Sequence, residues 1–287
     1  MPKDFDMAQH SLIPVRVESY RGLIFGTLSD DSESLTDYIG PEMLPWVDRI
    51  FHKPVEYLGC TRQYAYSNWK LYYENVKDPY HASLLHLFHT TFNIYRSNMR
   101  GQTITDRRNG LHSIITTVPL AGDETAEEYK KQNITTYQDN VKLADPSVLT
   151  VRTEFEEQTS NHIHTLFPST VIQQIHNTLA VRQILPKSAS EFELIFHFFG
   201  YADDDAELRA LRLKQANLVG PTGYISMEDT EATELVQRSI GSADPGSASY
   251  LGMGDESQDK EESLITEHMI RSFWCGYRGL MGWAIEG

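Results

Sequence analysis

The pattern of hydrophobic and polar positions predicts strands in the middle of the chain. Two short apolar runs at 12–18 and 22–26, separated by Tyr20-Arg21-Gly22, indicate a hairpin near the start. Further strands are predicted at 55–66, 111–118, 170–176, 179–185 and 191–199. The last three follow one another after only a few residues, which favours antiparallel pairing because parallel crossovers need a dozen or more residues.

Helices are predicted on both sides of this region. Ser67 or Asn68 caps a helix entry, and helical stretches begin near Ser32 and Pro41. Later helices are predicted at 203–217, 227–240 and 261–283, and the polar stretches 123–145 and 241–260 are predicted to be mainly loops. We therefore expect an α+β fold in which helices flank an antiparallel sheet, with a long C-terminal helix.

Charge and composition exclude several kinds of protein. Forty Asp and Glu against 25 Lys and Arg give a net charge of −15, which argues against nucleic acid and anionic membrane surfaces as partners. The sequence contains no run of about 18 apolar residues, so we expect no transmembrane helix. The first residues lack the apolar core of a signal peptide. Cys60 and Cys275 stand alone, so we expect a reduced, cytoplasmic protein without a disulfide framework.

Histidines carry the most informative chemistry. His81, His86 and His89 fall within nine residues. Two histidines and one distant carboxylate form the facial triad of non-haem Fe(II) oxygenases, which leaves coordination positions open. His86 and His89 share a helix face, whereas His81 and His86 are about 140° apart on an ideal helix and converge only if Pro79 breaks the helix or the backbone is locally irregular. From spacing alone, the same histidines also fit a packed or solvated helix.

A second histidine pair lies in the strand-rich region. His162 and His164 are two residues apart, which places both on one face of a strand. Such a pair binds metal in some folds, but no acidic residue lies beside it at strand spacing. We therefore favour the cluster around His81.

The segment around that cluster resembles a known family. Asn68-Trp69-Lys70, followed by Glu-Asn-x-x-Asp-x-Tyr-His-x-x-x-x-His over 74–86, is similar to the iron-binding segment of the large (α) subunit of Rieske-type aromatic ring-hydroxylating oxygenases. Residues 12–26 (LIPVRVESYRGLIFG) resemble the stretch that follows the Rieske domain in that family. Residues 220–231 (GPTGYISMEDTE) are similar to its carboxylate-ligand segment, and the match looks closest to the salicylate and anthranilate hydroxylating branch.

The resemblance implies roles for individual residues. It implies that His81, His86 and Asp229 are ligands of a mononuclear Fe(II). It also implies that Asp78 bridges to a histidine of the Rieske cluster across a subunit boundary, and that Asn75 lies close to the iron without being a firm ligand. Without the resemblance, Asp229 reads as an ordinary solvated acid in the first turn of a helix, and Asp78 as a turn residue before Pro79.

Residues of a substrate pocket are less well defined by the sequence. Gln173 interrupts an apolar strand and offers a donor to a benzoate-like carboxylate, although strand alternation leaves Gln174 as an equal candidate. Either glutamine also fits a strand edge that faces water. Met227, in the carboxylate-ligand segment, is the other pocket candidate. His89 is interpreted as a residue beside the metal site or a structural one.

Electron supply is the point where the chain departs from the family pattern. A Rieske [2Fe–2S] centre needs two Cys and two His, and neither Cys60 nor Cys275 has a histidine two or three residues away. We therefore expect the N-terminal Rieske domain to be absent from this chain and its cluster to lie in a separate domain or chain. We also expect that this chain alone does not turn over.

These observations lead to one main hypothesis and two alternatives. The resemblance implies that residues 1–287 form a single catalytic domain of helix-grip-like fold. This domain would hydroxylate or dihydroxylate an aromatic ring, such as that of salicylate or anthranilate, with O₂ and electrons from NAD(P)H through a reductase and ferredoxin. It also implies a small (β) subunit and an α3 or α3β3 assembly. The first alternative is a non-catalytic module of α+β fold that binds a hydrophobic ligand. The second is a structural or regulatory subunit left after loss of the Rieske part.

Overall fold

The computed structural model describes residues 5–92, 99–118, 130–131, 141–155, 159–221, 223–244, 249–255 and 259–283. Most of the predicted loop at 123–145 and parts of the one at 241–260 lie outside these residues. The chain forms two compact units, residues 1–51 and residues 52–287, a division that the hydrophobic pattern did not indicate. No helix in the described ranges is long and apolar enough to cross a membrane.

The first unit begins with a short turn and a hairpin. A 3-10 turn, η1 (Met7–His10), precedes strands β1 (Arg16–Tyr20) and β2 (Leu23–Thr27), which pair antiparallel as the sequence predicts. Arg21 and Gly22 form the two-residue turn, and both have positive φ, as hairpin turns of this length require. Two short helices follow, α1 (Leu35–Ile39) and α2 (Leu44–Ile50); Ser34 caps the first by accepting the N–H of Asp37.

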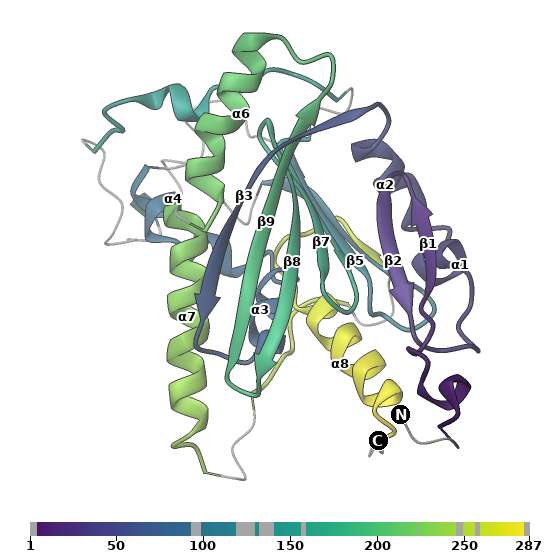
Figure 1. The fold of residues 1–287 in the computed structure, drawn as a ribbon. Coiled ribbons are helices and arrows are strands. Elements are labelled where there is room, and N and C mark those ends of the chain that lie inside the picture. The colour runs from purple at the N-terminus through teal and green to yellow at the C-terminus, as the bar shows by residue number, and fades with distance from the viewer. Residues whose placement is uncertain are drawn as a thin grey trace. The chain divides into compact units, whose positions relative to one another are not determined.

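The second unit is built on an eight-stranded antiparallel sheet (Figure 1). The strands lie in the order β10-β4-β5-β6-β7-β8-β9-β3. Their bounds are β3 (Val55–Ala65), β4 (Arg100–Thr105), β5 (Ser113–Val118), β6 (Asn161–Leu166), β7 (Thr170–Ile175), β8 (Thr178–Ser188), β9 (Glu191–Tyr201) and β10 (Lys260–Glu261). The predicted strands at 55–66, 111–118, 170–176, 179–185 and 191–199 are therefore present, and their antiparallel pairing confirms the α+β prediction.

Helices supply the rest of this unit. They are α3 (Trp69–Asn75), α4 (Leu87–Phe92), α6 (Ala206–Val219), α7 (Tyr224–Ile240) and α8 (His268–Leu280), with 3-10 turns η2 (His81–Ser83) and η3 (Pro146–Leu149). Asn68 caps α3 through its side chain, as predicted. The C-terminal helix is shorter than predicted, because residues 260–261 pair with β4 and are extended.

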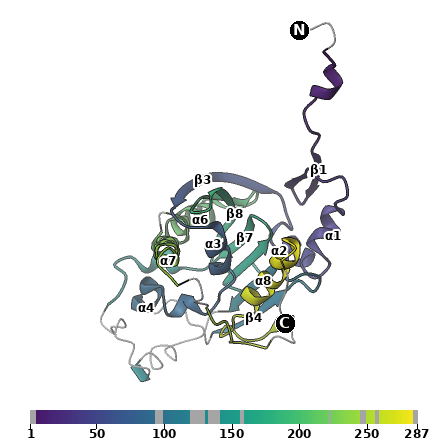
Figure 2. The same cartoon turned by 90° about the horizontal axis from the view of Figure 1, so that it is seen from below.

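The core lies between the sheet and two of these helices. Tyr72 and Tyr73 of α3 and Phe273 of α8 are fully buried in one apolar cluster with residues of β7, β8 and β9. Figure 2 shows α3 and α8 over the same face of the curved sheet. This packing fixes the end of α3, from which the candidate site begins.

The junction of α6 and α7 positions the second part of the site. Figure 1 shows the two helices following one another along the sheet. Gly223 stands at the start of α7, where a Cβ would lie 2.1 Å from the carbonyl oxygen of Leu218. Only glycine fits such a close approach, which lets α7 begin directly after α6 and present its first turns to α3 and α4.

Candidate metal centre and substrate cavity

A break in the helix after α3 brings the first two histidines together. Pro79 disfavours the helical region for Asp78, and Asp78 Oδ1 accepts the backbone N–H groups of Tyr80 at 2.8 Å and His81 at 3.3 Å. The ring centroids of His81 and His86 consequently lie 5.2 Å apart. This is the irregular backbone that the five-residue spacing requires for the pair to converge.

Lys77 fastens this segment to the sheet. It is fully buried, and its Nζ donates to Leu111 O at 3.0 Å, Ser113 Oγ at 2.9 Å and Thr165 Oγ1 at 2.7 Å. Burial holds the pKa of Lys77 well below its usual range. The lysine thus ties the residues just before Asp78 to β5 and β6, a contact that the sequence analysis did not foresee.

His81, His86 and Asp229 come together at one point. One ligand atom from each lies within 4.8 Å of the others. Asp229 Oδ1, from the first turns of α7, is 3.3 Å from His81 Nε2 and 3.1 Å from His86 Nε2. Asn75, at the end of α3, donates from Nδ2 to Asp229 Oδ1 at 2.9 Å and lies 3.3 Å from His81 Nε2.

A carboxylate also lies on the other side of each histidine. His86 Nδ1 lies 2.9 Å from Glu228 Oε2, and Glu228 Oε1 accepts the backbone N–H of Phe88. His81 Nδ1 lies 3.5 Å from Asp78 Oδ2. Because a carboxylate only accepts, Glu228 favours a proton on Nδ1 of His86, whereas the separation of Asp78 and His81 is too long for a hydrogen bond. Metal-binding histidines in proteins are oriented by partners of this kind.

The short distances within the cluster shift the pKa values of its residues. Burial alone would lower the pKa of His81, but hydrogen bonds to Asp229 and Asp78 outweigh burial and raise it to about 10. The pKa of His86 is also raised, because Asp229 outweighs the effect of burial there. The two histidines hold the pKa of Asp229 well below its usual range despite burial. The site is thus built to hold positive charge beside an ionised Asp229.

The other histidines are placed differently. The His89 ring lies 4.9 Å from that of His86, and burial lowers the pKa of His89 to about 3, so it is neutral. His162 and His164 are buried on β6, with ring centroids 5.9 Å apart. Among the described residues, the group with metal-ligand geometry consists of His81, His86 and Asp229.

The cluster opens onto a cavity of about 320 Å³. His81, His86, Asp229 and Asn75 contribute to its wall, and so do apolar side chains from the sheet, from α7 and from the segment before β6, including Ile115, Leu149, Val151, Ile163, Ile175 and Ile225. A small aromatic molecule fits a mainly apolar space of this volume.

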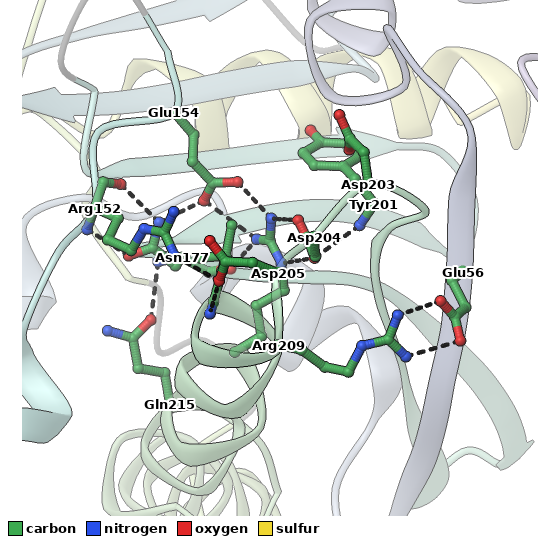
Figure 3. Close-up of polar contacts among 12 residues, drawn as sticks. Glu56, Arg152, Glu154, Asn177, Tyr201, Asp203, Asp204, Asp205, Arg209 and Gln215 are labelled. Atoms are coloured by element: carbon green, nitrogen blue, oxygen red, sulfur yellow. Dashed lines mark hydrogen bonds and ion pairs between the residues drawn. The ribbon is translucent and has the colours of Figure 1, made fainter.

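A polar network holds the wall segment that carries Leu149 and Val151 (Figure 3). Gln215 of α6 donates to the carbonyl groups of residues 148 and 150, and its Oε1 accepts the N–H of Asn177. Arg212, which is 1% exposed, forms ion pairs with Glu154 and Asp204. The network joins α6, the turn between β7 and β8 and residues 147–154, so it sets the position of this wall.

Comparisons with known proteins decide the family. The family described as "Ring hydroxylating alpha subunit (catalytic domain)" matches residues 56–282. The chain belongs to this family. The match lies within the second unit and includes the ligand cluster and the cavity wall.

Relatives and solved structures agree with this assignment. The chain is 62% identical over 283 residues to the anthranilate 1,2-dioxygenase large subunit of Burkholderia cepacia. It is 44% identical to the terephthalate 1,2-dioxygenase terminal oxygenase component subunit alpha 2 of a Comamonas species and 32% identical to the salicylate 5-hydroxylase large oxygenase component of a Ralstonia species. These alignments cover 98–99% of this chain and 66–68% of the relatives. They confirm the predicted branch of the family.

The fold itself matches a solved structure. Naphthalene 1,2-dioxygenase from a Rhodococcus species aligns with a TM-score of 0.69 at 19% identity, over 93% of this chain and 66% of that one. At this identity the comparison supports the fold alone.

In this chain, the pocket residues predicted from the sequence lie outside the lining of the cavity. Gln173 is fully buried, but it does not line the cavity; its Oε1 accepts the Nε–H of Arg182 at 2.5 Å. Gln174 on the opposite face donates to backbone carbonyl groups, including that of His176 at 2.9 Å. Met227 is 48% exposed and also lies outside the cavity lining.

Arg182 is the pocket residue that the sequence analysis missed. It is 6% exposed and lines the cavity, with Nη1 donating to the hydroxyl of Tyr72 at 2.9 Å and the guanidinium 4.9 Å from the centre of the Phe196 ring. Within the described residues, no carboxylate pairs with it. The signal was an arginine at an inward position of the apolar run 179–185, between Ala180 and Ile184.

Proposed function

We propose that this chain is the mononuclear-iron catalytic domain of an oxygenase that hydroxylates or dihydroxylates aromatic acids. The observation that carries the proposal is the meeting of His81, His86 and Asp229 at the wall of a mainly apolar cavity that also contains the buried Arg182. The family membership supports the ring-hydroxylating activity.

The donor set fits Fe(II). Two imidazole nitrogens and one carboxylate oxygen face a common point, which is the two-histidine, one-carboxylate set of non-haem iron oxygenases. Bound iron supplies the O₂ and redox chemistry that amino-acid side chains lack. His81, His86 and Asp229 would hold it, while Glu228 fixes the His86 ring in a ligating orientation.

The buried Arg182 supports the proposal that the substrate is an acid. Buried charges in proteins are normally paired, and this guanidinium has no carboxylate partner within the described chain. A carboxylate on the substrate would complete the pairing, with geometry that suits a guanidinium fork. Anthranilate, terephthalate and salicylate, which give the relatives their names, are all benzene rings with a carboxylate.

The side chains around the cavity have separate roles in this proposal. Arg182 orients the acid, and the apolar wall around Ile163 and Ile175 receives the ring and excludes water. Asn75 donates to Asp229, which keeps that carboxylate in position without using a ligand site on the metal. Asp78, which is partly exposed and faces His81, is the residue that we assign to the electron path from a Rieske centre.

Electron supply and assembly complete the proposal. The chain spans about two thirds of the length of its curated relatives, whose names describe large or alpha subunits of oxygenase components. We propose that a Rieske [2Fe–2S] centre in a separate domain or chain, a reductase with or without ferredoxin, and a small subunit act with it in an α3 or α3β3 assembly in the cytoplasm.

A reconstitution experiment tests this function. The chain is loaded with Fe(II) without oxygen, supplied with a Rieske component, reductase and NADH, and given anthranilate, salicylate, benzoate and, as an uncharged control, toluene. We expect hydroxylated product from at least one acid and little from toluene. Arg182→Met should weaken binding of the acid about 10- to 100-fold, because charge-assisted hydrogen bonds contribute about 1.5–3 kcal/mol.

The outcomes separate this function from a ligand-binding module. A chain that binds aromatic acids but takes up no iron would support the non-catalytic alternative. Iron uptake without product from any acid, with the Rieske component shown to be reduced, would contradict the proposed activity. Product formation from toluene as good as from the acids would contradict the role of Arg182.

A further inference from the structure

Two polar side chains at one end of the cavity each have a buried atom without a hydrogen-bond partner among the described residues. Asn161 begins β6, and His176 lies in the turn after β7; both line the cavity. Asn161 Oδ1 and His176 Nδ1 are buried, and neither has a hydrogen-bond partner within the part of the chain that the structure describes. The two residues are close in the sheet, because Asn161 pairs with Ile175, the neighbour of His176.

Other polar groups at this end are satisfied. The hydroxyls of Thr117 and Ser160, which also line the cavity, lie 3.4 Å apart, and Ser160 Oγ donates to the carbonyl of Thr117. A buried polar atom without a partner destabilises the folded protein, because it has lost its hydrogen bonds to water. Native proteins rarely retain such atoms without a reason, and a ligand that supplies the missing partners is one.

The backbone holds His176 in an unusual conformation. Its φ is +51°, a region that few non-glycine residues adopt. The turn is fixed from both sides: the His176 N–H donates to Ser160 O at 2.7 Å, and Gln174 Nε2 donates to His176 O at 2.9 Å. Residues held in this region occur often at ligand sites, and here the ring is directed to the cavity wall.

This polar end is separate from Arg182. Along β7, Arg182 is the register partner of Val171, whereas Asn161 is the partner of Ile175. Four residues of strand correspond to about 13 Å. A substituent that reaches Asn161 and His176 is therefore a different group from the carboxylate that Arg182 would hold.

We propose that Asn161 and His176 form a second polar subsite, which binds a neutral hydrogen-bonding substituent, amino or hydroxyl, on the aromatic acid. The proposal rests on the proposed function, because it takes the cavity to be the substrate site. It makes these two residues specificity-determining residues that select among substituted benzoates.

The chemistry of the two side chains fits such a substituent. The Asn161 amide both donates and accepts, and a neutral imidazole does the same through its two nitrogens. Burial lowers the pKa of His176 to about 4, so the ring is uncharged near neutral pH. An amino or hydroxyl group matches this pair, whereas an apolar substituent leaves both atoms unsatisfied.

Binding measurements on the full 287-residue chain, loaded with Fe(II) without oxygen, test the subsite. Titration calorimetry compares benzoate with its 2-, 3- and 4-amino and hydroxy derivatives. We expect at least one derivative to bind about 3- to 10-fold tighter than benzoate, the gain expected of a net hydrogen bond. Asn161→Leu and His176→Phe should each remove most of this advantage, so that the derivative binds about as tightly as benzoate in these variants. Asn161→Ser and His176→Gln serve as less disruptive variants, and circular dichroism checks their folding.

The possible results are distinct. No advantage for any derivative in the wild-type chain, or an advantage that survives in all four variants, would overturn the subsite. Arg182→Met is the control for the proposed function: it should weaken benzoate and its derivatives by the same factor and preserve their ratio. Failure of benzoate to bind the wild-type chain would overturn the acid-binding function and, with it, the subsite.

Discussion

Glu228 connects the two halves of the candidate metal centre. It stands next to Asp229 on α7, and its carboxylate faces Nδ1 of His86 at 2.9 Å while also accepting the backbone N–H of Phe88 at 3.1 Å. One residue thus orients a ligand from the segment between α3 and α4 and fixes the start of α4 against α7. The neighbouring Asp229 supplies the third ligand atom.

Replacing this carboxylate should weaken metal binding without destroying the site. We expect Glu228→Gln to lower Fe(II) affinity about 10- to 100-fold, the usual effect of removing such an orienting partner. Glu231→Gln, an exposed acid on the same helix, is the matched control and should leave the affinity unchanged. Equal affinities for the two variants in an anaerobic titration would show that Glu228 does not orient His86.

Asp78 allows iron binding and electron transfer to be separated. Asn at this position keeps an oxygen for the N–H groups of Tyr80 and His81 but removes the charge beside His81 Nδ1. We expect Asp78→Asn to retain iron and to lose about 10- to 100-fold in product formation when the Rieske component is supplied. Unchanged product formation would remove Asp78 from the electron path, and loss of iron would make it a support of His81 instead.

The ion-pair network under α6 should dominate the stability of the cavity wall. Arg212→Leu leaves Glu154 and Asp204 without their buried partner, and breaking a buried pair in this way costs about 3–5 kcal/mol. Arg209, on the same helix, forms an exposed ion pair with Glu56. Arg209→Leu should therefore lower the free energy of unfolding by only a small fraction as much. Urea unfolding of the two variants measures the contrast, and similar losses would contradict it.

The absence of a Rieske ligand set from the printed sequence gives a spectroscopic prediction. Neither cysteine has a histidine two or three residues away, and both cysteines are exposed. We expect the iron-loaded chain to lack the red-brown absorption of a [2Fe–2S] centre and to show no sustained turnover with NADH, reductase and ferredoxin alone. Such absorption, or continued hydroxylation without an added Rieske component, would contradict this.

Much of this account could be predicted from the sequence, and the exceptions have physical reasons. Apolar runs separated by short turns, such as 170–176 and 179–185, were located within a few residues. β4 (Arg100–Thr105) was missed because its polar, threonine-rich residues carry little apolar signal.

The site residues also fall into those that the sequence predicts and those that it does not. A long motif led to the prediction of His81, His86 and Asp229 as ligands, although spacing alone left open whether they converge, as the structure shows them to do. Arg182 and His176 were not found, because their importance depends on which face of a strand or turn meets the cavity and on which partners are missing there. Those are tertiary properties, and no local pattern encodes them.

The central claim is that His81, His86 and Asp229 bind one iron ion, and anaerobic Fe(II) titration with metal analysis tests it most directly. The wild-type chain should bind one Fe(II). His81→Ala, His86→Ala and Asp229→Ala should each abolish stable binding, while His162→Ala, which changes the buried histidine pair on β6, should keep it. Full iron occupancy in any of the three ligand variants, or loss of iron in His162→Ala with the fold intact, would contradict the assignment.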